Sequence, residues 1–189
     1  MIERDSPMSD TKLWKADGFI ADDPWSLLDE ETMPDALAAP ITSESNAKLL
    51  VPLAHYLALS DSQRQAGNIG IVLAPADDVA RLQPYLEHIA LIAVTFPAFS
   101  DGRAYSQASL LRSRYGYEAE IRAIGDVLID QIPLMLRCGI NTFTVSNATA
   151  IRRLSEGRLP AISAHYQPSA QSAAPGKSYS WRHRSGSPA

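Results

Sequence analysis

The fold is decided by a transition from strand to helix near the middle of the chain. An apolar run, Ile89-Ala-Leu-Ile-Ala-Val-Thr95, leads into Phe96-Pro-Ala-Phe-Ser-Asp-Gly-Arg-Ala-Tyr-Ser-Gln107. The first stretch has the length and the branched side chains of a buried strand, and the residues from Arg103 onward place apolar side chains at helical spacing. Ser100 and Asp101 therefore lie where a strand hands over to a helix, which is the edge at which α/β proteins bind ligands.

The same alternation of strand and helix is predicted four times along the chain. Predicted strands occupy residues 69–74, 89–95, 119–123 and 141–145. The helices between and after them are predicted to begin at Asp77-Asp78, to span 103–115 and 127–138, and to begin at Ser146 or Asn147, and Pro133 is expected to bend or divide the third. Short strands joined by helices predict an α/β fold with a parallel sheet and right-handed crossovers. Half of a TIM barrel and a small open doubly wound sheet both fit this pattern.

The sequence outside these units is less regular. Residues 13–20 predict an N-terminal β-hairpin, because Asp17-Gly18 between two apolar arms is a strong turn signal. Residues 22–25 predict a turn or a short helix, and residues 29–46 predict an irregular linker. These predictions divide the chain into a hairpin and linker at 1–48, an α/β domain at 49–167 and a flexible tail at 168–189.

Composition excludes several functional classes. The chain has 189 residues, 46% of them hydrophobic and 20% charged, and a formal net charge of −4, which argues against a general nucleic-acid binder. No apolar run approaches the ~20 residues needed to cross a bilayer, and no signal-peptide pattern is present, so the expected location is the cytoplasm. Cys138 is the only cysteine, which excludes an intrachain disulfide, and the four histidines have no metal-ligand spacing.

Three consecutive strands are predicted to end in similar polar turns. These turns are Ser100-Asp101-Gly102-Arg103, Gly125-Asp126 and Ser146-Asn147. If the strands are parallel, the turns share one edge, where helix N-termini attract anions. The sequence therefore predicts a site for a small anion, a phosphate or a carboxylate.

Residue types suggest roles within that site. Asp101 and Asp126 are candidate catalytic groups that would move a proton, and Tyr105 is a candidate for stabilising a developing charge. The candidate substrate-binding residues are Ser100, Arg103, Arg122 and Gln131.

Each candidate also has a structural alternative. Asp101 and Asp126 are good helix N-caps, and Tyr105 can simply pack its ring. Glu120 and Arg122 point to the same side of their strand, so Arg122 could form an ion pair with Asp126 or Asp101.

Cofactor motifs are missing from the sequence. No Gly-x-Gly-x-x-Gly follows the first regular strand, and there is neither a Walker loop nor a hydrolase nucleophile elbow. We therefore expect that the protein binds no cofactor and no metal. The sequence does not exclude a flavin or a nicotinamide.

Several long sequence motifs resemble those of a bacterial family of unknown function. They are residues 96–108, Leu110-Leu-Arg112, Glu120-Ile-Arg-Ala-Ile-Gly-Asp-Val-Leu-Ile-Asp-Gln131 and Arg137-Cys-Gly139, and the resemblance covers about residues 49–167. Members of that family are typically encoded beside assimilatory sulfite and sulfate reduction genes and are often labelled probable oxidoreductases. This chain departs from the family pattern at Ala98, Ala119 and Ile140, and the family supplies no catalytic residues to carry over.

Two functions follow from the resemblance and the residues together. The first is an accessory protein of cytoplasmic assimilatory sulfite or sulfate reduction, which docks on sulfite reductase or another sulfur-assimilation protein. The acidic N-terminal region and the arginine-rich second half would offer it complementary surfaces. The alternative is an enzyme that acts on a small anionic substrate at the strand-exit edge, and the family label suggests an oxidoreductase. A homodimer is a further expectation, because a half-barrel has open sheet edges.

Overall fold

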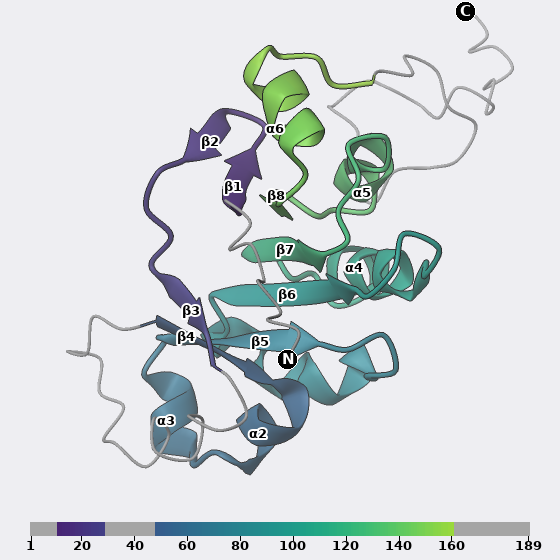
Figure 1. The fold of residues 1–189 in the computed structure, drawn as a ribbon. Coiled ribbons are helices and arrows are strands. Elements are labelled where there is room, and N and C mark those ends of the chain that lie inside the picture. Colours follow the sequence, from purple (N-terminus) through teal and green to yellow (C-terminus); the bar gives the residue numbers. More distant parts are fainter. Residues whose placement is uncertain (1–10, 29–47, 161–189) are drawn as a thin grey trace, which may run out of the picture.

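Eight strands join in one curled sheet in the computed structural model, which describes residues 11–28 and 48–160 (Figure 1). The strands are β1 (Lys12–Lys15), β2 (Gly18–Ile20), β3 (Trp25–Leu27), β4 (Lys48–Pro52), β5 (Ile69–Leu73), β6 (Leu91–Phe96), β7 (Glu120–Gly125) and β8 (Thr142–Val145). Their order across the sheet is β2-β1-β8-β7-β6-β5-β4-β3. The predicted hairpin at residues 13–20 is confirmed, because β1 and β2 form an antiparallel pair.

The strand order decides between the two predicted architectures. From β3 to β8 every neighbouring pair is parallel, and the spatial order of these strands is their order in the chain. A doubly wound sheet reverses direction at a switch point, whereas a barrel adds each new strand on the same side. The fold is therefore a half-barrel, closed off at one end by the antiparallel pairing of β1 with β8.

Helices cover one face of this sheet. They are α2 (Leu53–Ala58), α3 (Asp61–Gln65), the 3-10 helix η1 (Val79–His88), α4 (Arg103–Ser113), α5 (Ile132–Arg137) and α6 (Ala148–Ser155). Side chains alternate along each strand, so Ile69, Ile71 and Leu73 all point from β5 into the main core beneath the helices. Burial of this continuous apolar layer is the main term that holds the half-barrel together.

The opposite face of the sheet is only partly apolar. Leu50, Leu91 and Ala93 form a second, smaller buried cluster there, against which Trp25 packs. Arg122 is buried on the same face, one strand away from Ala93 and in register with it. This mixture of apolar and charged side chains distinguishes the inner face of the half-barrel from the helix-covered face.

Two local predictions are wrong. The helix predicted at 127–138 begins only at Ile132, since Pro133 lies in the first turn of α5 rather than within a longer helix. A proline has no N–H to donate, so the first turn is where a helix tolerates it. The turn or short helix predicted at 22–25 gives way at Trp25 to β3, which pairs parallel with β4. The predicted linker at 29–46 and the tail at 168–189 lie outside the described residues.

Candidate functional site

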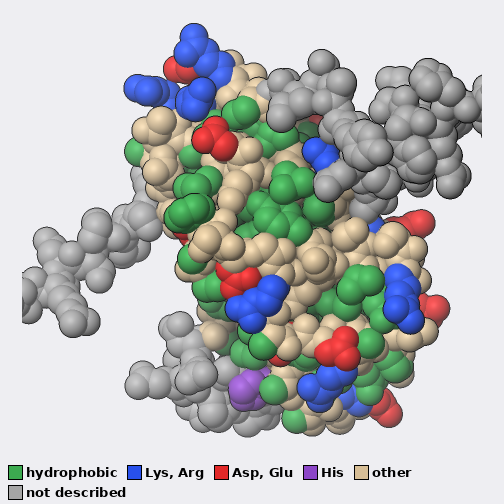
Figure 2. Space-filling model, turned by 90° about the vertical axis from the view of Figure 1, so that its right-hand side faces the viewer, with side chains coloured by type: hydrophobic (Ala, Val, Ile, Leu, Met, Phe, Trp, Pro, Cys, Tyr) green, Lys and Arg blue, Asp and Glu red, His purple; other side chains and the backbone are tan. Residues whose placement is uncertain are grey.

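The exits of β5, β6, β7 and β8 lie at one end of the half-barrel, on the right of Figure 1. Figure 2 views the molecule from that side and shows apolar side chains gathered in patches in the middle of the face. The predicted placement of the polar turns at a common edge is thus confirmed for the parallel strands.

Two side chains hold the loop after β6 by its backbone. The N–H of Phe99 donates to the Asp126 carboxylate at 3.0 Å, and the Gln131 amide donates to the Phe99 carbonyl at 2.8 Å. The Asp126 N–H in turn donates to the Phe96 carbonyl at 2.7 Å. Gly125 allows this approach, because its φ is +94° and a Cβ would lie 2.3 Å from the same carbonyl oxygen. Asp126 and Gln131 therefore fix the 97–102 loop.

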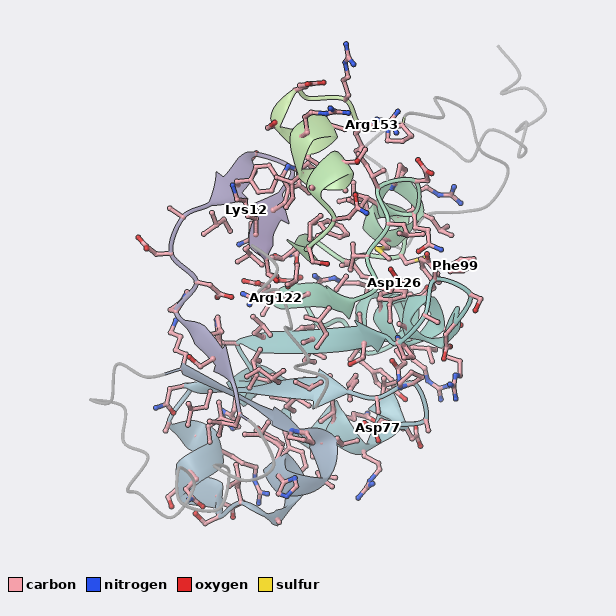
Figure 3. All side chains as sticks on the ribbon, in the orientation of Figure 1. Lys12, Asp77, Phe99, Arg122, Asp126 and Arg153 are labelled. Carbon is pink, nitrogen blue, oxygen red and sulfur yellow. The ribbon has the colours of Figure 1, made fainter. Side chains whose placement is uncertain are left out.

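The fixed loop presents an aromatic side chain to solvent. Phe99 is 60% exposed, although both polar groups of its backbone are bound. Figure 3 places Phe99 and Asp126 together at the strand-exit edge. Among the described residues Phe99 has the most exposed large apolar side chain, and two hydrogen bonds hold its backbone.

Asp101 and Arg103 bind each other. The Arg103 guanidinium donates to both oxygens of the Asp101 carboxylate, at 3.0 and 2.6 Å, and the Arg103 N–H donates to the same side chain at 3.2 Å. The side-chain and backbone hydrogen bonds from Arg103 lower the pKa of Asp101 to about 2. Asp101 is therefore ionised at neutral pH and cannot hold a proton to donate. The N-cap position of α4 is Gly102, which offers no side-chain cap, and the Asp101 carboxylate just before it accepts from the N–H of Arg103, the first residue of the helix.

Tyr105 packs as a core aromatic. Its ring meets Phe96 edge-on, with centroids 5.1 Å apart, and its buried hydroxyl has no partner among the described residues. Burial raises the pKa of Tyr105 and the pKa of the half-buried Cys138 thiol. Both groups therefore stay protonated at neutral pH. Ser100 is exposed in the 97–102 loop, and no described contact joins it to Tyr105.

Arg122 does not reach the strand-exit edge, and the prediction that it pairs with Asp126 or Asp101 is wrong. Its guanidinium donates to Asp23 at 2.5 and 3.1 Å and to Glu120 at 3.1 and 2.9 Å. The predicted placement of Glu120 and Arg122 on one side of β7 is confirmed by these contacts. The physical reason for the error is position along the strand, because Arg122 lies three residues before Gly125 and faces the inside of the half-barrel (Figure 3).

A charge network therefore exists where sequence reasoning placed none. Lys15 reaches the other oxygen of Glu120 at 3.6 Å, so two cations and two carboxylates balance around a side chain that is only 4% exposed. Asp23 is 99 residues from Arg122 in the chain, and no local pattern marks it as a partner. Phe99 was missed for a different reason: an aromatic residue in a turn predicts packing, and its backbone is held by side chains 27 and 32 residues away in the sequence.

The described ranges hold no cluster of three or more His, Cys, Asp or Glu side chains that could bind a metal. Within the same ranges no helix is both long and apolar enough to cross a membrane.

Comparison with protein-family models matches residues 70–176, more than half of the chain, to DUF934, described as a bacterial protein of unknown function. The chain belongs to the DUF934 family. Neither the curated proteins nor the solved structures include a significant match. The DUF934 match spans β5 to α6, which includes the 97–102 loop and the two residues that hold it.

Proposed function

We propose that this DUF934 protein is an accessory protein of cytoplasmic assimilatory sulfite or sulfate reduction, which docks on sulfite reductase or another sulfur-assimilation protein. The assignment to this pathway rests on the resemblance of the sequence motifs described above to a family encoded beside sulfite and sulfate reduction genes. The docking surface is the strand-exit edge, and its anchor is Phe99. We propose no cofactor for this accessory protein.

The exposed ring of Phe99 is the observation that carries the docking role. Aromatic residues are enriched among the few side chains that supply most of the binding energy of an interface. Such an anchor binds best when it is ordered before the partner arrives, since less conformational entropy is then lost on association. Asp126 and Gln131 provide that order by binding the N–H and the carbonyl group of Phe99.

The same contacts weigh against the alternative of an enzyme for a small anion at this edge. The Asp101 carboxylate already offsets the charge of the Arg103 guanidinium, which weakens the attraction of Arg103 for a substrate anion. Asp126 already accepts a hydrogen bond from the loop, and Tyr105 lies packed against Phe96. Arg103, Asp126 and Tyr105 thus already make contacts within the free protein that a catalytic role would have to share or replace.

The test is a binding measurement between the full chain and sulfite reductase from the same organism, at low salt. We expect the wild-type protein to bind and Phe99→Ala to weaken the interaction at least tenfold, because truncation of an anchor removes about 2 kcal/mol or more. Leu27→Ala is the matched control: Leu27 is 58% exposed on β3 and should change the affinity less than twofold.

The two parts of the proposal fail separately. Absence of binding by the wild-type protein to sulfite reductase and to the other enzymes of the pathway would remove the pathway assignment. Binding that Phe99→Ala leaves unchanged would retain the partner and remove the docking loop. Sulfite binding by the isolated chain that Arg103→Ala abolishes, with the fold intact, would instead support the enzyme.

A further inference from the structure

We draw no further inference here: the strongest candidate, the patch of exposed arginines at and just beyond the C-terminal end of α6 (Arg152, Arg153 and Arg158), carries none, because nothing in residues 11–28 and 48–160 shows which acidic partner would cover it.

Discussion

Two arginine–aspartate pairs of similar chemistry occupy opposite situations in this molecule. Arg103 binds Asp101 two residues away, and its side chain is 61% exposed. Arg122 binds Asp23 from the other end of the chain and is 4% exposed. Both guanidinium groups use two nitrogen atoms on the carboxylate. The two pairs differ in their exposure to water, and this exposure decides how much each pair contributes to stability.

The comparison shows that the Arg103–Asp101 pair, formed within one loop, affects local structure. The Arg122–Asp23 pair, formed between distant segments, stabilises the fold. Water and salt screen an exposed pair, so Arg103 and Asp101 shape the start of α4 without holding the protein together. The Arg122 pair joins the segment between β2 and β3 to the middle of β7. A buried charge that loses its partner is strongly unfavourable, so this second pair locks the N-terminal segment onto the sheet.

The largest effect is expected from Arg122→Met. It leaves the carboxylates of Asp23 and Glu120 without their shared partner, and the free energy of unfolding should fall by about 3–5 kcal/mol. Urea denaturation measures this loss. Arg103→Gln is the control and should leave the denaturation midpoint close to wild type.

The combined variant Arg122→Met, Asp23→Asn, Glu120→Gln sharpens the test. It removes the unpaired charges along with the arginine and should recover part of the lost stability. If Arg122→Met alone lowers the free energy of unfolding by less than about 1 kcal/mol, the buried pair contributes no more than an exposed pair, and the proposed difference between the two pairs is wrong.

The two pairs also show what could be predicted from the sequence. Alternating strands and helices from Ile69 onward predicted the parallel sheet, because hydrophobic periodicity is a local property. Asp101 and Arg103 were predicted to lie in the same turn because they are close in the sequence, although their ion pair was not predicted. The strand order that makes a half-barrel is global, and so is the contact between Asp23 and Arg122. No spacing in the sequence encodes either of them.

The helix at Ile132 illustrates a local failure. Apolar residues are frequent from Val127 to Leu136, and a single helix was therefore predicted there. Pro133 and the hydrogen bond from Gln131 to Phe99 decide otherwise, since residues 126–131 form the turn that holds the loop. At this site a tertiary contact takes precedence over the local pattern.

An intermediate effect is expected from Asp126→Ala. The Phe99 amide loses its acceptor, so its hydrogen exchange should become about fivefold faster. Exchange followed by NMR or mass spectrometry over residues 97–102 is the measurement. Asp130→Ala removes an exposed carboxylate from the same turn and should leave that rate unchanged. Unaltered exchange at Phe99 in the Asp126 variant would mean that the loop does not need this hydrogen bond.

The smallest effect concerns the exposed pair and acid. Arg103 lowers the pKa of Asp101 from its ordinary value of 3.8 to about 2, so the stabilisation is complete above pH 4 and disappears as the pH falls through 2. In Arg103→Gln the pKa of Asp101 should return toward 3.8, which carboxyl NMR titration can follow. Arg153→Gln, on α6, should leave the titration at its wild-type position. A low Asp101 pKa that survives in Arg103→Gln would assign the shift to another group.

The two outermost strands have a consequence for self-association. β2 and β3 end the sheet on either side, and each has only three residues. A strand so short offers few free amide and carbonyl groups to an incoming chain, which is how natural sheets avoid growing into fibres. Within residues 11–28 and 48–160, the two edge strands of the sheet are therefore poor templates for pairing with a strand of a second molecule.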